Sequence, residues 1–394
     1  MVCEKMVQLG KKGSIIREIF EYGNQRRALI GKENVFDFSL GNPSIPAPPE
    51  VTEALVRLLQ ESEPTALHGY TSSAGDMDTR TAIADYLNKT YDAHASARRI
   101  YMTCGAAASL TVTLNALVNK GEEVILFAPF FPEYVVFTEQ AGGKAVPVRC
   151  REEDFQPDLE AFAAALTEKT KAVLLNSPNN PSGAVISPET LTALCDILRK
   201  KQAEYKHEIY LIADEPYREL VYGVPVPYVT NYYDNTIVCY SFSKSLSLPG
   251  ERIGYILVSD KMEDGDTVFA AVCGAGRALG FVCAPSLFQK LIPFCLGKTA
   301  DVSVYEQNRD ILYSALTSYG FKMAKPEGAF YIFMKAPSGD AFAFYEEAKK
   351  YELLLVPGDD FCYPGYVRLA YCVSKEQVLR SLPAFEQLAK AVLK

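Results

Sequence analysis

The sequence predicts an α/β protein with a large domain, built on a mostly parallel seven-stranded sheet between helices, and a smaller α+β domain. From about residue 97 onward, short apolar runs alternate with longer helix-like segments. The runs are rich in Val, Ile and Leu, which is typical of parallel strands covered on both faces. The chain of 394 residues is also long enough for one large domain and a smaller one.

Seven apolar runs are the expected strands of the large sheet. A helix rich in Ala and Leu is expected to begin at Gly105, and further helices are expected at 157–169 and 187–201. The last two runs have no helix between them, which predicts one antiparallel, hairpin-like member. In chain order the runs are IYMT (100–103), EVILFA (123–128), KAVPVRC (144–150), KAVLLNS (171–177), EIYLIADE (208–215), TIVCYSFS (236–243) and RIGYILVS (252–259).

The pattern changes after about residue 281, where helices frame three apolar runs, FYIFMKAP (330–337), LLLVPG (353–358) and YVRLAYC (366–372). This arrangement is typical of a small α+β domain. A helix near residues 14–30 is expected to pack onto the same domain. We therefore expect a large domain at 46–280 and a small domain formed by both chain ends, residues 1–45 and 281–394.

Composition and charge argue against several classes of protein. The net charge is −8 and no basic run is present, so nucleic acid is not an expected partner. No apolar run approaches the roughly 20 residues that cross a bilayer, and the first residues lack the apolar core of a signal peptide. The ten cysteines are scattered singly, so we expect reduced thiols, no metal site and a cytoplasmic protein.

The residues that follow each strand are the candidate site, because ligands of open α/β sheets lie outside the carboxyl ends of the strands. Lys244 follows the sixth run, and a buried lysine is costly unless its ammonium is paired or chemically changed. Asp214 lies in the fifth run, and a buried aspartate needs a cationic or hydrogen-bonding partner. The small residues at 105–107 begin a helix, whose free N–H groups suit a phosphate. Phe131, the turn PNNPSG (178–183), Ser241, Ser243 and Arg252 are expected at the same edge.

Together these residue types match a site for pyridoxal phosphate. The lysine amine would form an imine with the cofactor aldehyde, which shares the charge within a conjugated system. The acid would hold a proton on the pyridine nitrogen, so that the ring accepts electrons. The serines, Arg252 and the helix N–H groups would hold the phosphate dianion.

Four motifs, NNPSG (179–183), ADEPY (213–217), SFSKSLSLPGERIGY (241–255) and YVRLAY (366–371), occur in this order. On these motifs the sequence resembles the fold-type I pyridoxal phosphate enzymes, specifically the class I/II aminotransferases related to aspartate aminotransferase. The resemblance runs from GNP at 41–43 to VRLAY at 367–371.

The resemblance implies a role for each cofactor-binding candidate. It implies that Lys244 is the Schiff-base lysine and proton shuttle, and that Asp214 is the partner of the pyridine nitrogen. Asn180 and Tyr217 would hydrogen-bond the phenolic oxygen of the cofactor, and Phe131 would stack on its ring. Lys244, Asp214 and Tyr217 are the implied catalytic residues. The implied phosphate-binding residues are Gly105, Ala106, Ala107, Ser241, Ser243 and Arg252.

The resemblance also implies how substrate and a second subunit bind. Arg368 would grip the substrate α-carboxylate, with Asn180 and the backbone of Gly41 beside it. Tyr70 would cross to the phosphate of the partner subunit, which implies a homodimer with shared active sites. The implied reaction is transfer of an amino group from an L-amino acid, aspartate by default, to a 2-oxo acid such as 2-oxoglutarate.

Alternatives remain open at this stage for the reaction and for single residues. A C–S β-lyase acting on cystathionine-like substrates shares the same motifs, and a non-catalytic ligand-sensing domain is a third reading that the acidic net charge disfavours. Phe131 could be plain core and Tyr70 an ordinary interface residue. Arg277, inside CGAGRALG (273–280), could bind a distal substrate carboxylate, although an ion pair at a dimer interface is the favoured reading.

Overall fold

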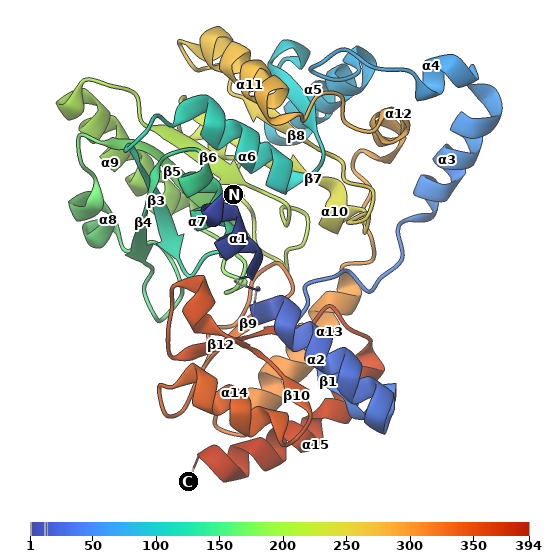
Figure 1. The fold of residues 1–394 in the computed structure, drawn as a ribbon, viewed down its shortest axis with the longest axis vertical. Helices are drawn as coiled ribbons and strands as arrows, with labels where there is room; N and C mark the ends of the chain where they lie inside the picture. The colour runs from blue at the N-terminus through green and yellow to red at the C-terminus, as the bar shows by residue number, and fades with distance from the viewer. Residues whose placement is uncertain (1, 12, 14, 394) are drawn as a thin grey trace.

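The large sheet contains seven strands in the order β2-β8-β7-β6-β5-β3-β4 (Figure 1). The computed structural model describes residues 2–11, 13 and 15–393. Neighbouring strands pair in parallel except around β8, which runs antiparallel to both β2 and β7. The seven predicted strands and the antiparallel member are confirmed. Their bounds are β2 (Ile100–Thr103), β3 (Glu123–Ala128), β4 (Lys144–Arg149), β5 (Thr170–Asn176), β6 (Tyr210–Asp214), β7 (Thr236–Ser241) and β8 (Gly254–Val258).

Two of these strands, β7 and β8, are shorter than the apolar runs that predict them, because the backbone conformation changes within each run. The Ser241 hydroxyl accepts the N–H of Ser243 and caps a single helical turn, α10 (Phe242–Ser245). The expectation that no helix separates the last two runs is therefore wrong. β8 begins at Gly254 and not at Arg252, because Arg252 has a φ of 54°, which is left-handed and not extended.

Helices cover both faces of the sheet. Every residue of β6, β7 and β8 is buried, and because side chains alternate between the two faces of a strand, neither face is open to solvent there. The α-helices between residues 46 and 300 are α3 (Pro49–Glu61), α4 (Pro64–His68), α5 (Met77–Tyr91), α6 (Ala106–Leu117), α7 (Glu133–Gln140), α8 (Leu159–Ala165), α9 (Pro188–Tyr205), α10, α11 (Gly265–Leu279) and α12 (Ser286–Cys295).

Helix ends follow their capping residues. Gly105 is the N-cap of α6, in agreement with the predicted helix start. The side chain of Asp158 accepts the N–H groups of Glu160 and Ala161, so α8 begins at Leu159, later than the predicted helix at 157–169, and it ends at Ala165. The segment CGAGRALG (273–280) lies at the end of α11, in a helix and not in a loop after a strand.

Both chain ends meet in a second, smaller set of strands and helices. β1 (Phe36–Asp37) pairs in parallel with β10 (Leu353–Leu354), and β11 (Val356–Pro357), β12 (Tyr366–Ala370) and β9 (Tyr331–Lys335) form an antiparallel sheet. In Figure 1 the blue helix α2 (Ile15–Ile30) lies against the orange and red C-terminal elements. The remaining helices of this part are α13 (Ser303–Ser318), α14 (Ala341–Lys349) and α15 (Lys375–Val392).

Ion pairs attach α2 to β1 and to the residue that precedes β10. Arg26 pairs with Glu352, and Arg27 pairs with Asp37. The expected helix start at Ser14 lies outside the described residues. α12, which follows residue 280, packs against α3, α4 and α5. The division of the chain at residues 46 and 280 stays a prediction.

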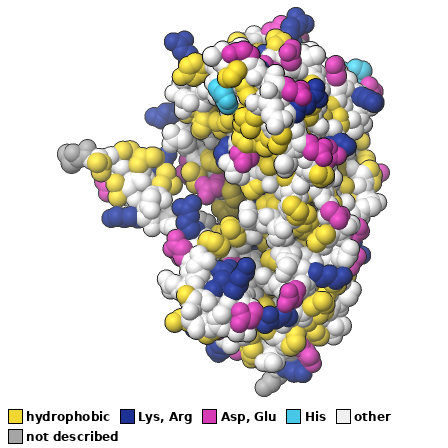
Figure 2. Space-filling model, turned by 90° about the vertical axis from the view of Figure 1, so that its right-hand side faces the viewer, with side chains coloured by type: hydrophobic (Ala, Val, Ile, Leu, Met, Phe, Trp, Pro, Cys, Tyr) yellow, Lys and Arg dark blue, Asp and Glu magenta, His cyan; other side chains and the backbone are white. Residues whose placement is uncertain are grey.

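Helix α1 (Glu4–Lys11) has no buried residue, and Figure 2 shows the N-terminal segment projecting from the body of the molecule. The side chain of Lys5 reaches the carbonyl oxygen of Glu139 in α7, at 3.3 Å. Among the described residues, no helix combines the length and the apolar character needed to cross a membrane.

Candidate active site

A pocket of about 280 Å³ opens at the carboxyl ends of β5, β6 and β7. It brings together every predicted site residue except Gly105 and Tyr70, although these residues come from segments as distant as Gly41 and Arg368. The predicted residues that line it are Gly41, Ala106, Ala107, Phe131, Asn180, Asp214, Tyr217, Ser241, Ser243, Lys244, Arg252 and Arg368. The other lining residues are Ile16, Leu40, Leu110, Tyr134, Asn176, Pro216, Pro249 and Tyr331.

Asp214 ends β6 inside the protein, where its side chain is 5% exposed. Its Oδ2 accepts the hydroxyl of Tyr134, and the amide of Asn176 donates to the Asp214 carbonyl oxygen at 2.9 Å and to Oδ2 at 3.4 Å. Burial raises the pKa of Asp214 to about 7, although the Tyr134 hydrogen bond works in the opposite direction.

The second carboxylate oxygen, Oδ1 of Asp214, is buried without a hydrogen-bond partner in the described part of the chain. A buried carboxylate oxygen in this position calls for a donor from a bound molecule, and a protonated ring nitrogen is such a donor. The residues present therefore fit a pyridine ring.

Lys244 lies in the single turn α10, directly after β7. Its Nζ donates a hydrogen bond to the carbonyl oxygen of Gly41 at 2.8 Å, a neutral partner. Burial lowers the pKa of Lys244 to about 8. An amine with a lowered pKa is partly neutral near physiological pH, and the neutral form is the one that attacks a carbonyl group.

One end of the pocket has donors suited to a phosphate group. Gly105 has a φ of 86° and no side-chain cap, so the first N–H groups of α6 lack helical partners. A Cβ atom on Gly105 would lie 2.8 Å from Nη2 of Arg252, which places that guanidinium beside the helix start. The hydroxyl oxygens of Ser241 and Ser243 are 2.7 Å apart at the same end. Gly105 thus borders this end without lining the pocket itself.

Arg368 lies on β12 at the boundary between the two parts of the chain, and it is 2% exposed. Its Nη1 donates to Oδ1 of Asn180 at 3.1 Å and its Nη2 donates to the carbonyl oxygen of Ser39. Its Nε has no partner among the described residues. A buried guanidinium with a free donor suits a planar carboxylate.

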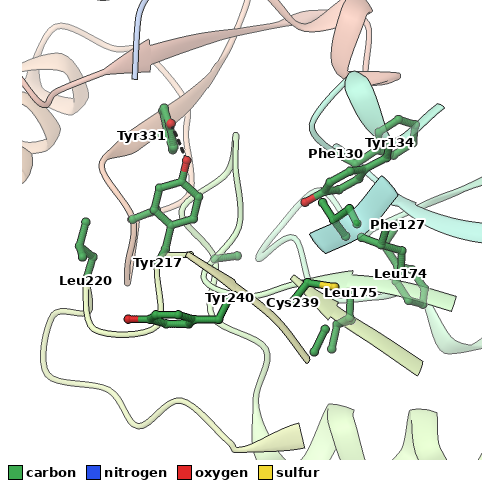
Figure 3. Close-up of a cluster of buried hydrophobic side chains, with 14 of the residues drawn as sticks. Phe127, Phe130, Tyr134, Leu174, Leu175, Tyr217, Leu220, Cys239, Tyr240 and Tyr331 are labelled. Atoms are coloured by element: carbon green, nitrogen blue, oxygen red, sulfur yellow. Dashed lines mark hydrogen bonds between the residues drawn. The ribbon is translucent and has the colours of Figure 1, made fainter. Parts of the chain in front are cut away.

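The sequence analysis missed all three further polar side chains of the pocket lining, and the other five unpredicted lining residues are apolar. Asn176 ends β5, so the rule that selected Asp214 at the end of β6 could have found it. Tyr134 lies three residues after Phe131, within α7, and no pattern singles it out. Tyr331 comes from β9, and its hydroxyl lies 2.8 Å from that of Tyr217, as the dashed line in Figure 3 marks.

Of three other residues that the sequence analysis considered, one lines the pocket and two do not. Phe131 lines the pocket and contacts Tyr134 edge-on, with ring centroids 5.7 Å apart. Tyr70 is 96% exposed and lies away from the pocket of its own chain. Arg277 is exposed on α11 and is not among the residues that line the pocket.

Comparisons with known proteins agree on one family. The family described as "Aminotransferase class I and II" matches residues 33–385. This chain is a class I and II aminotransferase. The aminotransferase is 32% identical over 379 residues to the aspartate aminotransferase of Thermotoga maritima, which covers 94% of this chain and 96% of that protein.

Solved structures share the fold of this aminotransferase. An amino transferase from Eubacterium rectale is 54% identical, with a TM-score of 0.98 and coverage of 100% of both chains. Aspartate aminotransferase from Thermus thermophilus, solved with maleate, is 26% identical with a TM-score of 0.86, and 98% of this chain and 100% of that chain are covered. The predicted family, the α/β fold and the enzymatic transfer of amino groups are confirmed.

Proposed function

We propose that this aminotransferase binds pyridoxal phosphate in the pocket and transfers the amino group of L-aspartate to 2-oxoglutarate. The observation that carries the proposal is the unpartnered Oδ1 of Asp214, which borders the same pocket as the Lys244 amine. Aspartate is the proposed donor because the related proteins of Thermotoga maritima and Thermus thermophilus are named aspartate aminotransferases.

Different residues of the pocket would hold different parts of the cofactor. Lys244 would hold the aldehyde carbon covalently through its amine, and Asp214 Oδ1 would accept the N–H of the ring nitrogen. Asn180 and Tyr217 would donate to the phenolic oxygen, and Phe131 would cover one face of the ring. The residues proposed to hold the phosphate are Gly105, Ala106, Ala107, Ser241, Ser243 and Arg252. When bound, the cofactor supplies an electron-accepting ring that stabilises negative charge at the substrate α-carbon.

The protein groups around the substrate bind it and move its proton. Arg368, with its free Nε, would bind the α-carboxylate beside Asn180 and Gly41. This grip would orient the Cα–H bond toward Lys244. Once the substrate amine has replaced Lys244 on the cofactor, the freed Lys244 amine would take the α-proton and return it to a carbon of the cofactor. The Gly41 carbonyl, which already accepts a hydrogen bond from Lys244 Nζ, would hold the amine at that position.

A half-reaction screen tests the reaction and the substrate. The purified holoenzyme is mixed with one L-amino acid at a time, and the visible absorbance of the bound cofactor is followed together with the 2-oxo acid formed. We expect L-aspartate to give the fastest loss of absorbance, with recovery on addition of 2-oxoglutarate. The β-lyase alternative is not favoured, since the relatives are named aminotransferases. Steady release of pyruvate and ammonia from cystathionine, without an oxo acid, would overturn the proposal.

We further propose that two copies form a homodimer in the cytoplasm, with the small domain of each built from residues 1–45 and 281–394 around a large domain at 46–280. The pairing of β1 with β10 supports a small domain that contains both chain ends. Tyr70 supports the dimer, because a tyrosine that is 96% exposed is typical of a residue that binds a partner surface. The cysteines at positions 3, 104, 150, 195, 239, 273, 283, 295 and 372 are free thiols, which suits a reducing compartment.

Mixed dimers test whether Tyr70 completes the site of its partner. Tyr70→Ala and Lys244→Ala homodimers would each lack one part of both sites. A hybrid of the two chains would contain one intact site, so mixing and re-associating the variants should restore activity that neither has alone. If mixing restores nothing although hybrids form, the shared site is excluded.

A further inference from the structure

Tyr134 is the single side-chain hydroxyl, among the described residues, that hydrogen-bonds the Asp214 carboxylate. It comes from α7, 80 residues earlier in the chain, and its side chain is 1% exposed. Its hydroxyl donates to Oδ2, the oxygen that Asn176 also reaches at 3.4 Å. Oδ2 therefore has two donors from the protein, whereas Oδ1 has none within the described chain.

The Tyr134 ring is held in place from two sides. Phe130 stacks against it with ring centroids 6.3 Å apart, and Phe131 contacts it edge-on at 5.7 Å. Figure 3 shows Tyr134 beside Phe130, with its hydroxyl pointing toward the side of the cluster where Tyr217 lies. Because these contacts hold the direction of the side chain, the hydroxyl oxygen is kept at one point, and this point selects which carboxylate oxygen it binds.

We propose that Tyr134 is a positioning residue, which by its hydrogen bond to Oδ2 fixes the Asp214 carboxylate in its ionised form with Oδ1 directed to the ring nitrogen of the cofactor. This inference rests on the proposed binding of pyridoxal phosphate. Tyr134 acts through Asp214 and forms no part of the covalent chemistry. Hydrogen bonds to charged groups are roughly twice as strong as neutral ones, so loss of this bond weakens the hold of Asp214 on the ring nitrogen.

The test is Tyr134→Phe, which removes the hydroxyl and keeps the ring between Phe130 and Phe131. Apoprotein is titrated with pyridoxal phosphate and, separately, with its 1-deaza analogue, in which a carbon replaces the ring nitrogen. We expect the Kd for pyridoxal phosphate to rise about tenfold or more, and the Kd for the analogue to rise by no more than about twofold, because the analogue has no ring N–H for Asp214 to accept. Tyr233→Phe is the matched control, since its buried hydroxyl donates to the Ile209 carbonyl oxygen at 2.8 Å, outside the pocket.

A double-mutant cycle with Asp214→Asn keeps the test independent of general damage to the fold. In the Asp214→Asn background, Tyr134→Phe should leave the Kd for pyridoxal phosphate unchanged, because the charged acceptor is already gone. Equal losses for both cofactors, an unchanged Kd in the single variant, or an undiminished Tyr134→Phe effect in the Asp214→Asn background would each overturn the role of Tyr134. If wild-type apoprotein itself fails to bind pyridoxal phosphate, the proposed function fails instead.

Discussion

The substitution Arg368→Lys tests whether Arg368 binds the substrate α-carboxylate with its planar guanidinium or only supports the fold as a buried positive charge. In the structure, Nη1 and Nη2 of Arg368 donate to Asn180 and to the Ser39 carbonyl oxygen, and Nε has no partner in the part of the chain that the structure describes. The guanidinium also lies over the rings of Tyr331 and Phe361, at 4.8 and 5.0 Å from their centroids. Lysine keeps the positive charge but has no planar fork, so it can bind a carboxylate at one point only.

The expected loss follows from the bond that lysine cannot make. A hydrogen bond to a charged group contributes about 1.5–3 kcal/mol, and each 1.36 kcal/mol corresponds to about a tenfold change in rate. Losing one of two bonds to the substrate carboxylate should therefore lower kcat/KM for L-aspartate about 10- to 150-fold.

The assay compares two substrates in the same variant. L-aspartate carries the α-carboxylate, whereas a primary alkylamine carries none, so only the reaction of aspartate should lose the full factor. Thermal unfolding of the variant is measured alongside, because loss of ring contacts also affects stability. If aspartate and the alkylamine lose activity equally, Arg368 supports the fold and does not bind the α-carboxylate.

Three further substitutions test the lysine, the aspartate and a backbone contact. Lys244→Ala should abolish amino transfer and the absorbance band that arises from the bond between the lysine and the cofactor, and a variant that still transfers amino groups at the wild-type rate would contradict the assignment. Asp214→Asn should stabilise the apoprotein by a few kcal/mol at pH 8 and hardly at pH 4. The sign follows because the pKa of Asp214 is raised to about 7 in the folded protein. Above that pH the folded wild-type protein contains an ionised buried carboxylate, which is unfavourable, and the asparagine variant contains none. Urea unfolding at the two pH values measures this, and an equal difference at both would refute it. Gly254→Ala should destabilise the protein by about 1–3 kcal/mol, because its Cβ would lie 2.2 Å from the Tyr240 carbonyl oxygen and 3.1 Å from the Gly105 Cα. Gly274→Ala, with nothing within 4 Å, is its control in the same unfolding assay and should not destabilise.

Much of the fold could be predicted from local patterns. All seven strands of the large sheet were found, because each is a short apolar run bounded by polar or turn-forming residues, and all but the edge strand β4 are buried along nearly their whole length. The ends of the strands were harder to predict where a single residue changes the backbone conformation. The cap at Ser241 and the left-handed conformation of Arg252 ended or delayed strands that apolar character alone would continue.

The sequence by itself determined which residues could meet at the edge of the sheet, because strand order along the chain and the carboxyl-end rule place Asp214, Ser241 and Lys244 there. Only the tertiary structure decided their partners. The hydroxyl of Tyr134 and the Gly41 carbonyl reach Asp214 and Lys244 from segments 80 and 203 residues away, and Arg368 reaches Asn180 across 188 residues. Such contacts depend on how helices and both chain ends pack around the sheet, and side-chain packing across these separations leaves no periodic signal in the sequence.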